Sequence, residues 1–138
     1  MRVMIVDDEK LARERLRELL NEIGGHSVIG EAMNGNEAVE KAAELNPDVV
    51  LMDIRMPGMD GLEAAMHLMG MDEPPIVIFT TAYDQHALHA FEVNAVDYLL
   101  KPIRKDRLAA ALDKAKKLTL EQLQDVNAAQ ESPQARTH

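Results

Sequence analysis

The chain has 138 residues, which suits one domain with a sizeable buried core. Its 46% hydrophobic and 28% charged residues are ordinary for a soluble globular protein, and the absence of cysteine excludes disulfides, thiolate zinc sites and cysteine nucleophiles. No apolar run approaches the roughly 18 residues that a membrane-spanning helix needs. Met1-Arg2 leads straight into a predicted strand rather than a signal peptide, so we expect a cytoplasmic location.

The net charge of −9 is unevenly distributed along the chain. Residues 1–103 hold 8 basic and 19 acidic side chains, whereas residues 104–117 hold 6 basic and 2 acidic ones. An acidic body repels nucleic acid, so we expect no direct nucleic-acid binding by this segment. The basic stretch is read as a solvated helix face, with a partner surface as the alternative.

The first part of the chain alternates strand and helix patterns. The apolar run 3–6 predicts a buried strand that ends in three acids, and apolar residues at helical spacing over 12–23 predict an amphipathic helix. Residues 28–32 predict a weaker strand, because a glycine and Glu31 interrupt them.

A second helix is predicted after this strand. Asn34 and Glu37 have the spacing of a capping box, and Asn46-Pro47 ends the helix. Four apolar side chains are expected to point inward: Ala38, Val39, Ala42 and Ala43.

The centre of the chain is the run Val49–Asp53, four apolar residues followed by a carboxylate. Such a run is typical of a strand covered on both faces in a parallel sheet. Residues 54–61 are rich in turn formers, so Asp53 is predicted where a buried strand meets a loop. Ligands bind at that carboxyl end in open α/β sheets.

The second half repeats the strand and helix alternation. Residues 76–79 predict a strand that ends in Thr80-Thr81-Ala82, residues 84–93 a fourth helix, and residues 95–100 a fifth strand. Before them, a short third helix is predicted from four apolar residues: Leu62, Ala65, Met66 and Met69.

The C-terminal part holds a fifth predicted helix, which begins near Arg104 and frays after Leu118 or continues to Leu123. Beyond it no periodic apolar residue occurs. We therefore expect one domain over residues 1–120 and a linker or disordered tail over 121–138.

Five strands alternating with five helices predict the α/β class, with a parallel sheet covered on both faces. The first, third and fourth strands are uninterrupted apolar runs and belong in the centre. The second and fifth carry Glu31 and Asp97 and suit the edges. The strand order 2-1-3-4-5 satisfies both conditions and can be built with right-handed crossovers. This order is that of the flavodoxin-like (βα)5 doubly wound fold.

In this order the first and third strands are neighbours, so Asp7, Asp8 and Asp53 converge at one edge of the sheet. Three carboxylates so close need a proton or a cation among them, and oxygen ligands select a hard ion such as Mg²⁺. Asp53 ends the central strand and is the best candidate nucleophile toward phosphorus, giving an aspartyl phosphate. Asp8 would ligate the metal, and Asp7 would bind it through water or orient it.

Two further polar groups follow strands at the same edge. Thr81 supplies a hydroxyl and Lys101 an ammonium, the groups that phosphoryl oxygens require. Each has an ordinary alternative, as a helix-start hydroxyl or a solvated surface charge, and an Asp pair is often a helix cap. The joint pattern over four strands favours a site. A cis peptide at Lys101-Pro102 would aim the ammonium inward, although the sequence leaves that geometry open.

These motifs resemble those of the receiver domain of two-component response regulators. The resemblance covers residues 1 to about 120, and four stretches carry it: Ile5–Glu9, Leu51–Gly61, Thr81-Ala82 and Lys101-Pro102. Within this family the chain is similar to the LytR/AlgR branch, on the stretches Leu11–Leu16 and Tyr83–Pro102.

The resemblance implies that a sensor histidine kinase phosphorylates Asp53. It also implies that Asp7, Asp8, Asp53 and the backbone carbonyl of Arg55 bind Mg²⁺. In this reading the chain is not an enzyme beyond its own Mg²⁺-dependent phosphorylation and dephosphorylation.

Thr81 and Lys101 would contact the phosphoryl oxygens, and Thr81 and Tyr98 would move together as a switch. The alternative for Tyr98 is a half-exposed tyrosine of an edge strand. The switch would change the surface of the fourth helix, fifth strand and fifth helix, a plausible homodimer interface.

Regulators of this branch carry a LytTR-type DNA-binding domain after the linker, which implies transcription regulation through an output domain absent from this chain. A natural single-domain receiver that acts by protein–protein interaction is the alternative, as is a constitutive interaction domain.

A phosphohydrolase with an aspartate nucleophile is the rival from another class. Such enzymes usually place a second acid two residues further on, where this chain has Arg55, which cannot donate a proton in that role.

Overall fold

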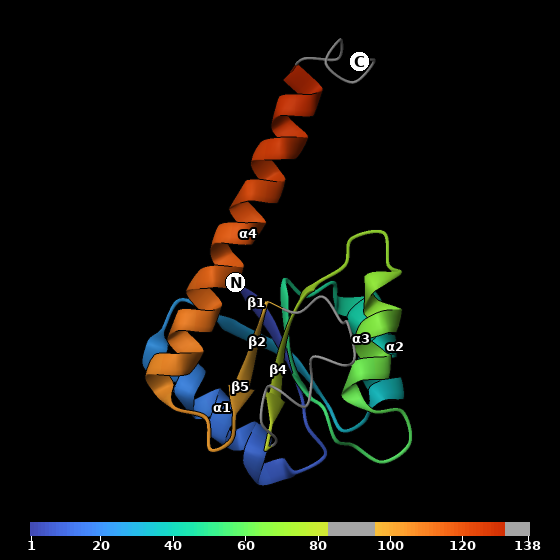
Figure 1. Ribbon diagram of the computed structural model, residues 1–138, viewed down its shortest axis with the longest axis vertical. Coiled ribbons are helices and arrows are strands. Elements are labelled where there is room, and N and C mark those ends of the chain that lie inside the picture. The colour runs from blue at the N-terminus through green and yellow to red at the C-terminus, as the bar shows by residue number, and fades with distance from the viewer. Residues whose placement is uncertain (83–95, 132–138) are drawn as a thin grey trace.

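The computed structural model describes residues 1–82 and 96–131, with side chains described through residue 120. Nine elements follow one another along the described chain: β1 (Arg2–Val6), α1 (Lys10–Ile23), β2 (Ser27–Ala32), α2 (Gly35–Leu45), β3 (Val49–Asp53), α3 (Gly61–Met69), β4 (Ile76–Thr81), β5 (Asp97–Leu100) and α4 (Lys105–Glu131). The predicted helix over 84–93 lies outside the described residues. The helix predicted from Arg104 is α4, shown with the other elements in Figure 1.

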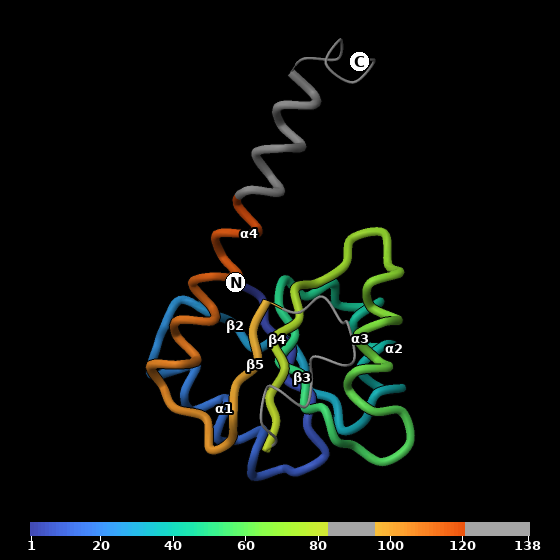
Figure 2. Tube along the Cα trace, in the orientation of Figure 1, coloured from blue at the N-terminus to red at the C-terminus, as the bar shows by residue number. Residues whose placement is uncertain are grey.

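The five strands form one parallel sheet in the order β2-β1-β3-β4-β5, which confirms the predicted order. Figure 2 follows the chain through β3, β4 and β5, which lie side by side. Val6 of β1 is in register with Met52 of β3, so the residues that follow these two strands emerge together at one edge.

Helices cover both faces of the sheet, with α1 and α4 on one side and α2 and α3 on the other (Figure 1). The side chains of β3 alternate between the two layers: Val49 and Leu51 pack with α1 and α4, whereas Val50 and Met52 pack with α2 and α3. All five residues of β3 are buried. Burial on both faces explains why this strand is an uninterrupted apolar run.

The predicted N-terminus of α2 is confirmed, because the backbone N–H of Glu37 donates to Asn34 Oδ1 at 2.8 Å. The Glu37 carboxylate pairs with Lys41 Nζ at 2.9 Å. Ala38 and Ala42 are buried as expected, but Ala43 is exposed. An alanine carries little information about the direction it faces, because its burial gains little free energy.

Only two of the four apolar residues that predicted α3 are buried. Leu62 and Ala65 are buried, whereas Met66 and Met69 are exposed, and the buried stripe also includes Ala64 and Leu68. The helix carries apolar residues around most of its circumference, so two overlapping stripes fit the helical period and the spacing alone does not choose between them.

The last helix is longer than predicted. It runs to Glu131, beyond the expected end between Leu118 and Leu123. Residues 124–131 contain neither glycine nor proline and are rich in good helix formers. The assignment of 121–138 as a linker stays a prediction. No helix in the described parts of the chain combines the length and apolar character needed to cross a membrane.

Candidate functional site

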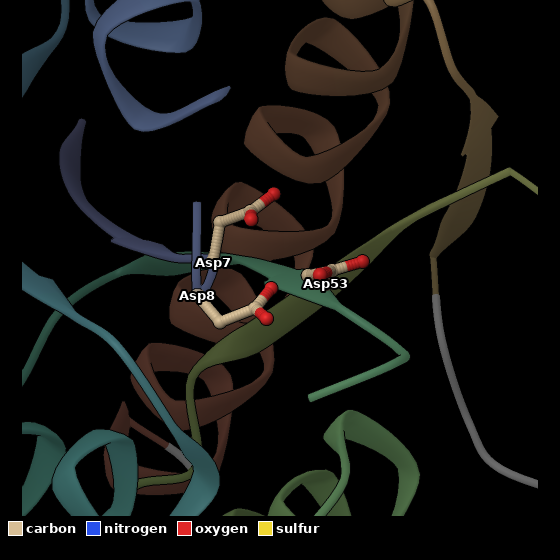
Figure 3. Close-up of side chains that lie close together, drawn as sticks. All are labelled: Asp7, Asp8 and Asp53. Carbon is tan, nitrogen blue, oxygen red and sulfur yellow. The ribbon is translucent and has the colours of Figure 1, made fainter. Parts of the chain in front are cut away.

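Three carboxylates meet at the carboxyl edge of the sheet, as predicted. Asp7 and Asp8 follow β1, Asp53 ends β3, and one carboxylate oxygen from each lies within 4.8 Å of the others. Figure 3 shows the three side chains gathered over the strand ends. We call this group the acid cup. Asp7 and Asp53 are buried and Asp8 is exposed, so the cup is open to ligands on the side of Asp8.

Asp7 is held by protein groups on both carboxylate oxygens. Its Oδ1 accepts the backbone N–H of Glu9 at 2.9 Å, and its Oδ2 accepts Lys101 Nζ at 2.9 Å. Its backbone N–H donates to the Ala32 carbonyl at 3.1 Å. Both carboxylate oxygens of Asp7 therefore contact protein groups.

Lys101 joins the acids from the end of β5. Besides Asp7, its Nζ lies 3.4 Å from Asp53 Oδ1, and its backbone N–H donates to the Thr81 carbonyl at 2.7 Å. Burial opposes the ammonium charge, but the hydrogen bond that Lys101 donates to Asp7 and the charge of Asp53 outweigh burial and raise the pKa of Lys101. The Lys101-Pro102 peptide, which the sequence left open, is cis.

Asp53 lies in surroundings that oppose its charge. Burial and the neighbouring Asp7 carboxylate raise the pKa of Asp53 to about 6, and Lys101 only partly offsets them. One ammonium therefore does not balance the acid cup. A bound cation would favour the ionised carboxylate, which is the form that can act as a nucleophile.

The other predicted site residues lie along the same edge or beside it. Thr81 ends β4 and is buried, next to Leu100 in register. Arg55 is exposed, two residues after Asp53, and the role of its carbonyl as a metal ligand stays a prediction. Tyr98 is half-buried on β5 and stacks on Phe79 with ring centroids 5.5 Å apart. That stacking is sound packing in itself, so the Thr81–Tyr98 switch also stays a prediction.

Two residues that shape the site were not assigned a role from the sequence. A Cβ on Gly61 would lie 2.1 Å from the Asp53 carbonyl oxygen, so only glycine lets α3 begin this close to the end of β3. Arg13 of α1 donates from Nη1 to the Asp7 carbonyl oxygen at 2.8 Å. Gly61 lies in the turn-rich segment 54–61, and that composition could have indicated its role. Arg13 could not have been found in this way, because its spacing is that of any residue on a solvated helix face.

An open parallel sheet that gathers three carboxylates and a lysine at its carboxyl edge defines a receiver-type α/β domain. The family model of the response regulator receiver domain matches residues 3–113, and the chain belongs to that family.

The relatives also match the predicted branch. The positive alginate biosynthesis regulatory protein of Pseudomonas aeruginosa is 54% identical over 116 residues, covering 83% of this chain and 47% of that protein. The sensory transduction protein LytT of Bacillus cereus is 43% identical over 124 residues, covering 90% of this chain and 50% of that protein. The chain thus spans about half the length of these relatives.

Solved structures agree with the fold. The response regulatory domain of protein mrkE from Klebsiella pneumoniae superposes with a TM-score of 0.76 at 32% identity, covering 86% of this chain and 97% of that one. The chain is therefore a receiver domain of a two-component response regulator, similar to LytR- and LytT-type regulators.

Proposed function

We propose that Asp53 accepts a phosphoryl group from a sensor histidine kinase, with Mg²⁺ bound in the acid cup. The observation that carries this proposal is the approach of three carboxylates within 4.8 Å beside an ammonium that contacts two of them. The burial of Asp53 at the end of the central strand supports its role as the reactive member.

The donor set fits Mg²⁺. Among the described residues the cup offers only oxygen ligands, and its three carboxylates face a single lysine, so a divalent cation would balance the remaining charge. Asp8 and Asp53 would hold the ion directly, Asp7 would orient them, and the Arg55 carbonyl would complete the protein ligands. Bound there, Mg²⁺ would neutralise charge on the phosphoryl oxygens.

In the transfer step, a carboxylate oxygen of Asp53 forms a bond to phosphorus while the bond from phosphorus to the kinase histidine nitrogen breaks. The bonding electrons leave with that nitrogen. Lys101 Nζ, which lies 3.4 Å from Asp53 Oδ1, would stabilise charge on one phosphoryl oxygen, and the Thr81 hydroxyl would donate to another.

The added charge would then change the surface of the domain. Thr81 would move toward the phosphoryl group and Tyr98 would follow it, altering the face that includes β5 and the start of α4.

Because the relatives are about twice as long, we infer that the complete regulator carries an output domain that binds DNA and controls transcription. The receiver itself would bind no nucleic acid, and a natural single-domain receiver is the alternative.

The direct test is phosphorylation with a small phosphodonor and Mg²⁺, followed by intact-mass measurement. We expect one phosphoryl group per chain, labile in acid and base, and its complete loss in Asp53→Asn. Asp72→Asn, which removes an exposed acid in another loop, should be labelled like the wild type. Phosphate that persists on Asp53→Asn, or repeated turnover of an added phosphomonoester, would contradict the proposal.

A further inference from the structure

Glu31 lies on the edge strand β2 and accepts hydrogen bonds from side chains of both α1 and α2. Arg13 Nε donates to Glu31 Oε1 at 3.1 Å, and Arg17 donates to the other carboxylate oxygen. From α2, Lys41 donates to the Glu31 backbone carbonyl. The hydrogen bond from Arg17 outweighs partial burial and lowers the pKa of Glu31, so the carboxylate stays charged at neutral pH.

Arg13 connects Glu31 to the acid cup by hydrogen bonds to both Glu31 and Asp7. Its side chain is only 12% exposed, and its Nη1 donates to the carbonyl oxygen of Asp7 at 2.8 Å. That carbonyl belongs to the peptide that joins Asp7 to Asp8, so the bond fixes the orientation of the peptide plane. The preceding peptide is also held, because the Asp7 N–H donates to the Ala32 carbonyl.

We propose that Arg13, held in place by Glu31, is a positioning residue that keeps the Asp7–Asp8 turn in the geometry that binds Mg²⁺. This inference rests on the proposed function, in which the acid cup is a Mg²⁺ site. Asp8 is exposed, and among the described residues no hydrogen bond or ion pair holds its carboxylate, so the position of that carboxylate depends on the peptide before it. Groups that orient metal ligands in this way commonly change metal affinity by 10–100-fold when they are removed.

Charge and positioning predict opposite results for the loss of Arg13. Removing a positive charge beside three carboxylates would make the cup more negative and would tighten Mg²⁺ binding. Removing the hydrogen bond to Asp7 would free the turn and would weaken binding. The sign of the change therefore separates a positioning residue from a merely nearby charge.

Arg17 provides a matched control on the same helix. It pairs with the same carboxylate, Glu31, and the Asp7 carbonyl is bonded by Arg13 and not by Arg17 among the described contacts. Arg17→Gln and Arg13→Gln thus remove the same charge and one partner of Glu31 each. Arg13→Lys keeps the charge but replaces the forked guanidinium with a single donor group.

The experiment is calorimetric titration of each variant with Mg²⁺ alone, together with amide hydrogen exchange at Asp7 in the metal-free protein. We expect Arg13→Gln to bind Mg²⁺ about tenfold more weakly than the wild type. The Mg²⁺ affinity of Arg17→Gln should stay within about twofold of the wild type. The affinity of Arg13→Lys should lie between those of the wild type and Arg13→Gln. Exchange at the Asp7 amide should be several-fold faster in Arg13→Gln than in Arg17→Gln.

Two results would overturn the inference: equal Mg²⁺ affinity in the two glutamine variants, or tighter binding in Arg13→Gln. If the wild type binds no Mg²⁺, the proposed function fails instead. In that case the Asp7 amide still shows whether Arg13 fixes the turn, because exchange is measured without metal.

Discussion

Asp53 combines burial with a nearby like charge, and this combination has a consequence for stability. Its pKa is raised from 3.8 to about 6, so the folded state holds the proton more tightly than the unfolded state does. When folding raises the pKa of a carboxyl group, the free energy of unfolding falls as the pH rises from the unfolded-state pKa toward the folded-state pKa. For Asp53 this loss of stability is largest above about pH 6. A bound cation would relieve this cost.

The measurable result is a stability gain in Asp53→Asn. In the absence of divalent cations, we expect its free energy of unfolding to exceed that of the wild type by about 1–3 kcal/mol at pH 7. The gain should shrink by about 1 kcal/mol at pH 5, where the wild-type carboxyl is mostly protonated. Urea unfolding at both pH values measures it. Asp72→Asn should show no comparable gain, and a wild type more stable than Asp53→Asn at pH 7 would contradict the account.

At the scale of the elements, the close contact between α3 and β3 sets the position of Asp53. The Gly61 N–H donates to the Ile54 carbonyl at 2.8 Å, and the Asp53 carbonyl occupies the space that a Cβ on Gly61 would need. The side chain of Asp60 caps the helix by accepting the Glu63 N–H at 2.8 Å. The loop is thus tied to the strand end that carries the reactive acid.

We therefore expect Gly61→Ala to move the end of β3. The clash with backbone atoms should lower the free energy of unfolding by about 1–3 kcal/mol and weaken Mg²⁺ binding as well, because Asp53 must shift. Gly70→Ala is the matched control, since a Cβ there meets its nearest atom at 3.4 Å. Its unfolding free energy should stay within about 0.5 kcal/mol of the wild type. Equal stability of the two variants would show that the contact is easily relaxed.

The strand order was predictable because burial differs among the strands. Central strands such as β3 must be apolar on both faces, whereas Glu31 and Asp97 are tolerated only at the edges, where Arg13 and Arg107 pair with them. The inner face of α3 was not predictable, because Met66 and Leu68 are equally apolar and only packing distinguishes them. The end of α4 was missed because helix propensity, not apolar spacing, extends it.

At the scale of the whole molecule, the acid cup could be predicted because a parallel sheet brings the ends of β1, β3, β4 and β5 to one edge regardless of their separation along the chain. The anchoring of Asp7 by Arg13 could not, because one arginine among several on α1 has no distinguishing spacing. On the surface expected to form a dimer, Asp97 pairs with Arg107 of its own chain at 3.0 Å.

A homodimer through β5 and its flanking helices remains our prediction for the phosphorylated state. Beryllofluoride with Mg²⁺ should raise the mass in solution from that of a monomer toward that of a dimer, measured by light scattering. Asp53→Asn should stay at its starting mass, because it cannot form the phosphoryl mimic. The same mass for the wild type with and without the mimic would contradict phosphorylation-dependent dimerisation.

We propose that Asp7, Asp8 and Asp53 form one Mg²⁺-binding cup in which Asp53 is the phosphoryl acceptor. A crystal structure with Mg²⁺ and beryllofluoride tests it most directly. We expect beryllofluoride on an Asp53 oxygen, Mg²⁺ bound by Asp8 and Asp53, and Lys101 Nζ within hydrogen-bond distance of a fluorine. Beryllofluoride on another side chain, or Asp8 and Asp53 too far apart to share the ion, would contradict it.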